Sequence, residues 1–189
     1  SEKVGELPAM VAPIVAPDSP WGTPGPTLCL ALGNFAALRE PGTPFDRARI
    51  DRLERWTRAS HRSLVHALER RRACGRVREC HGDLHSRNVV RIDGVLTPFD
   101  GIDFDPRLRW IDVASDVAFM AMDLEQFGRP DLAHAFLDAW WSESGDHGAA
   151  EPMPWLITYR ALVRAKVDAL RARQAVRAEE RAAAWSECE

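Results

Sequence analysis

The spacing of apolar and polar residues predicts a chain that is mostly helical. A long helix is expected to begin at Thr43-Pro44, because threonine suits the N-cap and proline the first helical position, and to end near Gly75. Its apolar positions recur at helical spacing and leave arginines on the other face: Ile50, Leu53, Trp56, Leu64, Val65 and Leu68. Further helices are expected over the ranges 28–38, 112–127, 130–141 and 154–185.

A short β-hairpin interrupts this helical pattern. Residues 89–92 and 95–99 are β-type runs, and Asp93-Gly94 between them is a strong signal for a two-residue turn. Antiparallel pairing brings the residue before the first strand close to the residues after the second. The sequence therefore predicts that Asp83 and Asn88 meet one of the aspartates that follow the hairpin.

The ends of the chain differ in composition from its middle. Six of the 13 prolines fall within the first 26 residues, so residues 1–27 are expected to form a proline-rich linker or an irregular segment across the core. Residues 28–185 are expected to form one α+β unit, predominantly helical, and residues 186–189 a tail.

Composition and charge restrict the classes of partner. The chain has 189 residues, 46% of them hydrophobic, which suits one compact domain. Its net charge of -3 gives no reason to expect nucleic acid or an anionic membrane as partner. The longest apolar run, 117–122, is too short to cross a bilayer. The four cysteines are widely spaced without a C-x-x-C pair, which favours a reducing, cytoplasmic location.

The residues that suit chemistry flank the hairpin. Residues 79–88 read E-C-H-G-D-L-H-S-R-N, and residues 99–105 read F-D-G-I-D-F-D. Carboxylates and a side-chain amide oxygen are the hard ligands that Mg²⁺ prefers, and a further carboxylate is then available as a base. Phosphoryl transfer uses this combination, because the metal neutralises phosphate charge while an aspartate accepts the proton of the acceptor hydroxyl.

The segment from His81 to Asn88 resembles the aminoglycoside phosphotransferase and choline kinase branch of the protein-kinase-like superfamily. The signature of that branch looks like H-G-D-[LIV]-H-x-x-N, and this segment fits it throughout. Residues 112–118, D-V-A-S-D-V-A, resemble the family's later D-x-x-x-D-[LIV]-A segment. Residues 78–125 and 159–170 look like a bacterial subgroup in which this domain is often joined to a P-loop ATP-binding domain.

The resemblance implies an ATP-dependent, Mg²⁺-requiring phosphotransferase that acts on a small-molecule hydroxyl. Asp83 would be the catalytic base and Asn88 a Mg²⁺ ligand, with His81 and His85 at the cofactor side of the loop. Two further aspartates would be structural braces: Asp112 and Asp116.

The second metal ligand is either Asp100 or Asp103. The family usually has a hydrophobic-Asp-aromatic unit after the hairpin, which Ile102-Asp103-Phe104 resembles, so we favour Asp103. The expected distance from Asn88 falls between the two aspartates, which leaves the choice open.

The sequence lacks the other half of a kinase nucleotide site. Lys3 and Lys166 are the only lysines, no G-x-x-x-x-G-K-[ST] pattern occurs, and no run of alternating strands precedes Thr43. We therefore expect the larger C-terminal lobe of a protein-kinase-like fold, without its N-terminal β-lobe, and little activity from this chain alone. The expected partners are a small-molecule hydroxyl acceptor, the missing lobe and, in a longer parent chain, a P-loop domain.

Other interpretations stay open at this point. One is a degenerate remnant that only binds a ligand or a partner. Another is a metal hydrolase that would use Glu79, His81, Asp83 and His85. In simpler interpretations His81 orders the loop, His85 either supports the loop or contacts the acceptor, and Asp112 caps a helix. Four acidic residues are candidates to attract a cationic aminosugar: Asp123, Glu125, Glu143 and Asp146.

Overall fold

The computed structural model describes residues 12–186, with side chains as far as residue 175. The described chain is α+β and mostly helical, as predicted. Its α-helices are α1 (Pro24–Leu38), α2 (Arg47–Ala73), α3 (Pro106–Arg109), α4 (Val113–Gln126), α5 (Pro130–Ser144) and α6 (Met153–Ser186). Its strands are β1 (Val77–Glu79), β2 (Val89–Ile92), β3 (Val95–Pro98) and β4 (Trp110–Asp112), and its 3-10 helices are η2 (Ser86–Asn88) and η3 (His147–Ala149).

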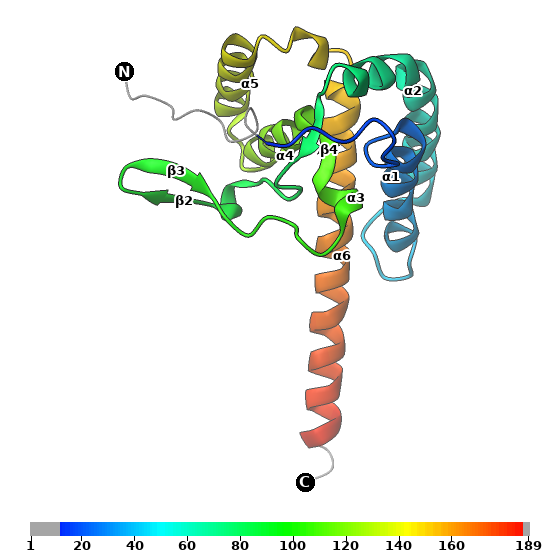
Figure 1. Ribbon diagram of the computed structural model, residues 1–189. Helices are drawn as coiled ribbons and strands as arrows, with labels where there is room; N and C mark the ends of the chain where they lie inside the picture. Colours follow the sequence, from blue (N-terminus) through cyan, green and yellow to red (C-terminus); the bar gives the residue numbers. More distant parts are fainter. Residues whose placement is uncertain (1–11, 187–189) are drawn as a thin grey trace.

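Helix α6 is the centre of the helical packing. Its first half packs against α1 on one side and α4 on the other, with α2 outside α1 and α5 outside α4 (Figure 1). Alanines 114, 118 and 121 on α4 are fully buried, and these small side chains allow neighbouring elements to approach closely. The second half of α6 extends beyond the other helices (Figure 1).

The apolar core joins α1, α2, α4, α5 and the beginning of α6. Trp155 is 1% exposed, and its indole N–H donates a hydrogen bond to the carbonyl oxygen of Thr57 at 3.0 Å. Trp140 is also buried, so both tryptophans belong to the core. Within residues 12–186, no helix is both long enough and apolar enough to cross a membrane.

Two separate antiparallel sheets complete the fold. Strands β2 and β3 form the predicted hairpin, in which Val89 pairs with Pro98 and Ile92 with Val95. Asp93 and Gly94 at its turn have φ of 49° and 84°, the left-handed conformation that an Asp-Gly turn of this kind requires. The hairpin projects from the helical body (Figure 1).

The second sheet pairs β1 with β4, and sequence analysis missed it. Val77 pairs with Asp112 and Glu79 with Trp110. Residues 13–15 lie along the other edge of β1, where the N–H of Val15 donates to the carbonyl oxygen of Val77 at 3.0 Å. Residues 12–23 of the proline-rich segment are therefore irregular and lie against β1, whereas residues 24–27 belong to α1.

Two predicted helix starts are wrong. Helix α1 begins at Pro24 rather than at residue 28, because the first turn of a helix tolerates proline, which lacks an N–H. Helix α2 is capped by Asp46, whose carboxylate accepts from the N–H of Ala48 at 3.1 Å. Thr43 instead donates its hydroxyl to the carbonyl oxygen of Leu38 at 2.9 Å, in the loop that follows α1.

Candidate active site

The loop from His81 to Asn88 connects β1 to β2 and carries the predicted catalytic residues. Gly82 has φ of 83°, which L side chains rarely adopt. A Cβ at this position would lie 2.6 Å from the carbonyl oxygen of Leu108. Glycine is therefore required here both by the backbone conformation and by the close approach of the segment before β4.

Asp83 and Asn88 are in direct contact. The Asn88 side-chain amide donates to the Asp83 carbonyl oxygen at 3.0 Å and to its carboxylate Oδ2 at 3.2 Å. Because Asn88 Nδ2 makes these bonds, its Oδ1 faces away from them and has no hydrogen-bond partner among the described residues. The Asp83 side chain is 39% exposed. One carboxylate oxygen and one amide oxygen are thus available to a ligand.

The His81 ring joins the loop to the base of the hairpin. Its Nδ1 accepts from the N–H of Asp83 at 3.3 Å, and its Nε2 lies 2.7 Å from the carbonyl oxygen of Phe99. A carbonyl oxygen only accepts, so Nε2 carries the proton in this arrangement. Both ring nitrogens are engaged, which favours the loop-ordering role for His81.

His85 is buried between the loop and α4. Its Nε2 lies 3.4 Å from Asp83 Oδ2, and its ring meets the Phe119 ring edge-on at a centroid distance of 5.6 Å. Its Nδ1 is buried without a hydrogen-bond partner. Burial lowers the pKa of His85, against the opposing effect of Asp83, so the neutral ring is favoured. His85 is thus a buried ring in contact with the Asp83 carboxylate.

Asp116 holds the start of the loop, at the place the resemblance implies for a brace. One carboxylate accepts from the N–H of His81 at 2.8 Å and from the N–H of Gly82 at 3.0 Å. Arg160 of α6 approaches the same carboxylate, with Nη2 3.5 Å from Oδ1. Burial raises the pKa of Asp116, and Arg160 and the two amides act in the opposite direction.

Asp112 does more than cap α4. Its Oδ1 accepts from the N–H of Ala114 at 2.9 Å, which is the predicted cap. Both of its oxygens also accept from Arg71, at 2.7 and 2.8 Å, and Arg71 binds Asp146 as well. Despite the opposing effect of burial, these hydrogen bonds raise the pKa of Arg71, which keeps it charged. Asp112 thereby joins α2 to β4 and α4.

Asp100 and Asp103 lie on the segment that follows the hairpin, and both are exposed. This segment is fixed through its backbone, since the N–H of Ile102 donates to the carbonyl oxygen of His81 at 2.9 Å. No hydrogen bond or ion pair among the described residues joins either side chain to Asp83 or Asn88. A cation shared by Asp83, Asn88 and one of these aspartates stays a prediction.

Two other sequence-based ideas do not agree with the structure. Within residues 12–186, no three His, Cys, Asp or Glu side chains are grouped to hold a metal ion, and Glu79 pairs with Arg109 at 3.2 Å. The zinc-hydrolase interpretation therefore has no ligand set. Asp123 and Asp146 are 2% and 3% exposed, so neither is a surface acid for an aminosugar.

Sequence reasoning missed several residues that support the loop. Asp123 binds Ser86 and Arg164, and Arg160 donates from Nη1 to the carbonyl oxygen of Gly82 at 2.9 Å. A signal was present for Asp123, because it ends an apolar run at the same helical face as Asp116. The arginines carried no such signal, since arginine at helical spacing is typical of a solvent-exposed face.

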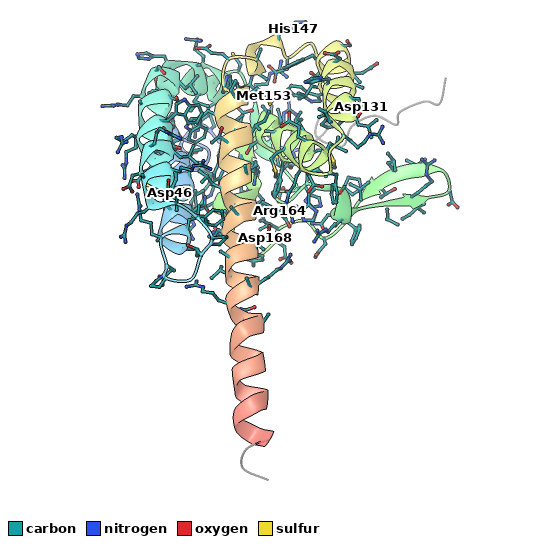
Figure 2. All side chains as sticks on the ribbon, turned by 180° about the vertical axis from the view of Figure 1, so that it is seen from behind. Asp46, Asp131, His147, Met153, Arg164 and Asp168 are labelled. Atoms are coloured by element: carbon teal, nitrogen blue, oxygen red, sulfur yellow. The ribbon has the colours of Figure 1, made fainter. Side chains whose placement is uncertain are left out.

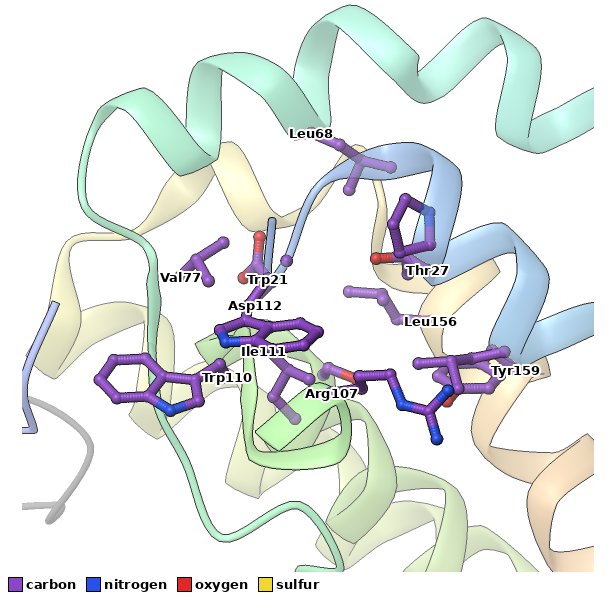
Figure 3. A pocket seen from close by; sticks show the side chains of 14 residues that line it. Trp21, Thr27, Leu68, Val77, Arg107, Trp110, Ile111, Asp112, Leu156 and Tyr159 are labelled. Carbon is purple, nitrogen blue, oxygen red and sulfur yellow. The ribbon is translucent and has the colours of Figure 1, made fainter. Parts of the chain in front are cut away.

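A mainly apolar pocket lies apart from the loop (Figure 3). It is bounded by the segment before α1, by β4 and by α6, and among the described residues those of the loop 81–88 do not line it. Its lining includes Trp21, Trp110, Ile111, Leu156, Tyr159 and Arg107.

Comparison with known proteins gives relatives but no family. No protein-family model matches the chain, and no solved structure matches it significantly. Uncharacterized proteins of Mycobacterium bovis and of two Mycobacterium tuberculosis strains are similar to it, each with 41% identity over 102 residues. The match covers 51% of this chain and only 20% of each relative, so the matched region is a small part of these longer proteins.

Proposed function

We propose that this chain is the larger lobe of an aminoglycoside-phosphotransferase-like kinase, which transfers the γ-phosphate of ATP to a hydroxyl of a small molecule. The observation that carries the proposal is the contact between Asp83 and Asn88, because it leaves one oxygen of each side chain available on a fixed loop. This is the donor set that Mg²⁺ prefers.

Each residue of the loop has a role in this proposal. Asp83 is 39% exposed and accepts the proton of the acceptor hydroxyl as that oxygen attacks phosphorus. Asn88 offers Oδ1 to the cation, and Asp103 or Asp100 completes the ligand set. His81 orders the loop through both ring nitrogens. When bound, Mg²⁺ neutralises charge on the phosphates of ATP.

Binding of Mn²⁺ as a probe for Mg²⁺ tests the proposal on this chain. We expect Mn²⁺ to broaden the amide NMR signals of residues 83–88 first, because carboxylate and amide oxygens suit both ions. Asp83→Asn and Asn88→Ala should each weaken Mn²⁺ affinity at least about tenfold. Asp138→Asn, at an exposed position on α5, is the matched control and should leave it unchanged. Broadening centred elsewhere would overturn the proposal.

ATP turnover separates the kinase from a remnant that only binds a ligand. We expect little turnover from residues 1–189 alone, because positioning of the nucleotide supplies much of phosphoryl-transfer catalysis. The measurement therefore uses a version of the chain extended upstream, with a panel of small alcohols and aminosugars. Asp83-dependent phosphorylation of any of them supports the kinase, and Mn²⁺ binding without turnover supports the remnant.

A further inference from the structure

The loop from His81 to Asn88 is held at both ends by carboxylates of one helix. Asp116 accepts from the N–H groups of His81 and Gly82, at the start of the loop. Asp123 Oδ2 accepts from the N–H of Ser86 at 2.9 Å and from its hydroxyl at 2.6 Å. Residues seven apart lie on the same face of an α-helix, about 10 Å apart along its axis. Helix α4 therefore presents two anchors to one loop.

The two anchors have matching partners on α6. Arg160 and Arg164 are one helical turn apart, and Arg164 Nη2 lies 3.0 Å from Asp123 Oδ1. Figure 2 shows Arg164 on the part of α6 that packs beside α4. Asp123 is 2% exposed, and a carboxylate buried to this degree requires such a partner.

Phe119 fills the space between the two ion pairs. Its ring is 1% exposed and receives the Arg160 guanidinium at 4.9 Å and the Arg164 guanidinium at 5.6 Å from its centroid. Arg160 Nη2 and Arg164 Nε are buried without hydrogen-bond partners, and both guanidinium groups lie over the electron-rich ring face. The anchors are thus parts of one packed unit that His85 also contacts.

The hydrogen bonds that Ser86 donates to the anchor Asp123 determine the position of Asn88. Ser86 is the first residue of η2 and Asn88 the last, and the N–H of Asn88 donates to the carbonyl oxygen of His85 at 2.9 Å. A shift of Ser86 therefore moves this short turn and with it the Asn88 side chain that touches Asp83. The anchor at Asp116 fixes the other end, two residues before Asp83.

We propose that Asp123, held by Arg164, is a positioning residue that fixes Asn88 against Asp83 through Ser86. The inference rests on the proposed function for its consequence, which is that the base Asp83 and the metal ligand Asn88 are held together before the cation binds. Its structural content is independent of that function, because it concerns the distance between two side chains in the free chain.

Substitutions at Ser86 test the anchor with little risk to folding. Ser86→Ala removes one hydroxyl and keeps the backbone N–H, while Ser86→Thr keeps the hydroxyl. Ser63→Ala removes an exposed serine on α2 whose hydroxyl donates to the carbonyl oxygen of Ser60, and it is the matched control. Two quantities are measured for each variant: the hydrogen-exchange rate of the Asn88 backbone N–H without metal, and the Mn²⁺ affinity.

We expect Ser86→Ala to speed exchange of the Asn88 amide about tenfold and to weaken Mn²⁺ binding about tenfold. Ser86→Thr should restore both values, and Ser63→Ala should change neither. Faster exchange with unchanged Mn²⁺ affinity would make the anchor merely structural and would overturn the proposal, as would unchanged exchange. If the unsubstituted chain binds no Mn²⁺ at Asp83, the proposed function fails, and the exchange rate of the Asn88 amide alone decides whether the anchor exists.

Discussion

Arg160 donates a hydrogen bond from Nη1 to the carbonyl oxygen of Gly82 at 2.9 Å, and so joins the central helix to the candidate catalytic loop. Its Nε also binds Ser115 on α4, at 3.0 Å from the hydroxyl oxygen and 3.1 Å from the carbonyl oxygen. One guanidinium thus connects α6, α4 and the loop. Because it is 4% exposed, water cannot replace these contacts.

Arg160→Met should therefore lower the free energy of unfolding by about 3 kcal/mol or more, because it leaves the Asp116 carboxylate buried without its charged partner. Arg129→Met removes an exposed, solvent-screened pair with Asp131 and should have a much smaller effect on the free energy of unfolding. Urea unfolding followed by circular dichroism measures both values. Equal losses for the two variants would contradict the role of Arg160.

Gly82 and Gly94 make a matched pair for the cost of a side chain at positive φ. Their φ values are 83° and 84°, but a Cβ at Gly82 would meet the Leu108 carbonyl oxygen, whereas a Cβ at Gly94 has nothing within 4 Å. Gly94→Ala should lower the free energy of unfolding by about 1 kcal/mol and Gly82→Ala by more than about 2 kcal/mol. Chemical unfolding of the two variants gives the two free energies of unfolding. A smaller loss of that free energy in Gly82→Ala would show that the loop shifts to accommodate the added methyl group.

His61 on α2 should make the protein less stable in mild acid. Burial lowers the pKa of His61 below its usual 6.5, so the unfolded chain binds the proton more readily. Above pH 6.5 His61 is neutral in both the folded and the unfolded chain, so it does not change the free energy of unfolding with pH. That free energy decreases as the pH falls from 6.5 toward the lowered pKa of His61.

The difference between the unsubstituted protein and His61→Phe isolates this effect, because the variant keeps a ring beside Trp155. The free energies of unfolding at pH 7.5 and pH 5.5 are compared. The loss on acidification should be smaller in His61→Phe, although His85, whose pKa burial also lowers, still contributes to it. Equal losses in both proteins would contradict the assignment.

The thiol of Cys80 should be inert while the protein is folded. Burial, together with nearby Asp116 and Asp112, raises the pKa of Cys80 well above its usual value, which disfavours the reactive thiolate. Cys29 and Cys74 are exposed. In a Cys188→Ser background, Ellman's reagent should label Cys29 and Cys74 in the native protein and Cys80 only after unfolding. Labelling of all three at one rate would contradict the protection of the partly buried Cys80.

Local patterns in the sequence predicted the elements whose signals are local. The Asp93-Gly94 turn and its flanking β-type residues determine the hairpin, and the spacing of apolar residues marks the long helices. The pairing of Val77–Glu79 with Trp110–Asp112 was missed, because each strand has three residues and their partners lie more than 30 residues apart. Such short strands form through tertiary contacts rather than through propensity.

The same distinction between local signals and tertiary contacts applies to the candidate site. The contact between Asp83 and Asn88 follows from a spacing within one loop, so sequence reasoning reached it. The burial of Arg160 and Arg164 depends on carboxylates of another helix, and nothing within their own segment distinguishes them from arginines in solvent. The hairpin signal predicts that Asp100 or Asp103 approaches Asp83, but it does not describe the path of the segment after the hairpin, on which that approach depends.

Because both anchoring carboxylates lie on α4, this helix sets the distance between the two ends of the loop. Their seven-residue interval sets a phase as well as a length, so one inserted residue between Asp116 and Asp123 would swing the later carboxylate about 100° around the axis. Most side chains between the two carboxylates are buried, so their sizes are constrained as well as their number. Insertions and deletions would thus be excluded from this stretch.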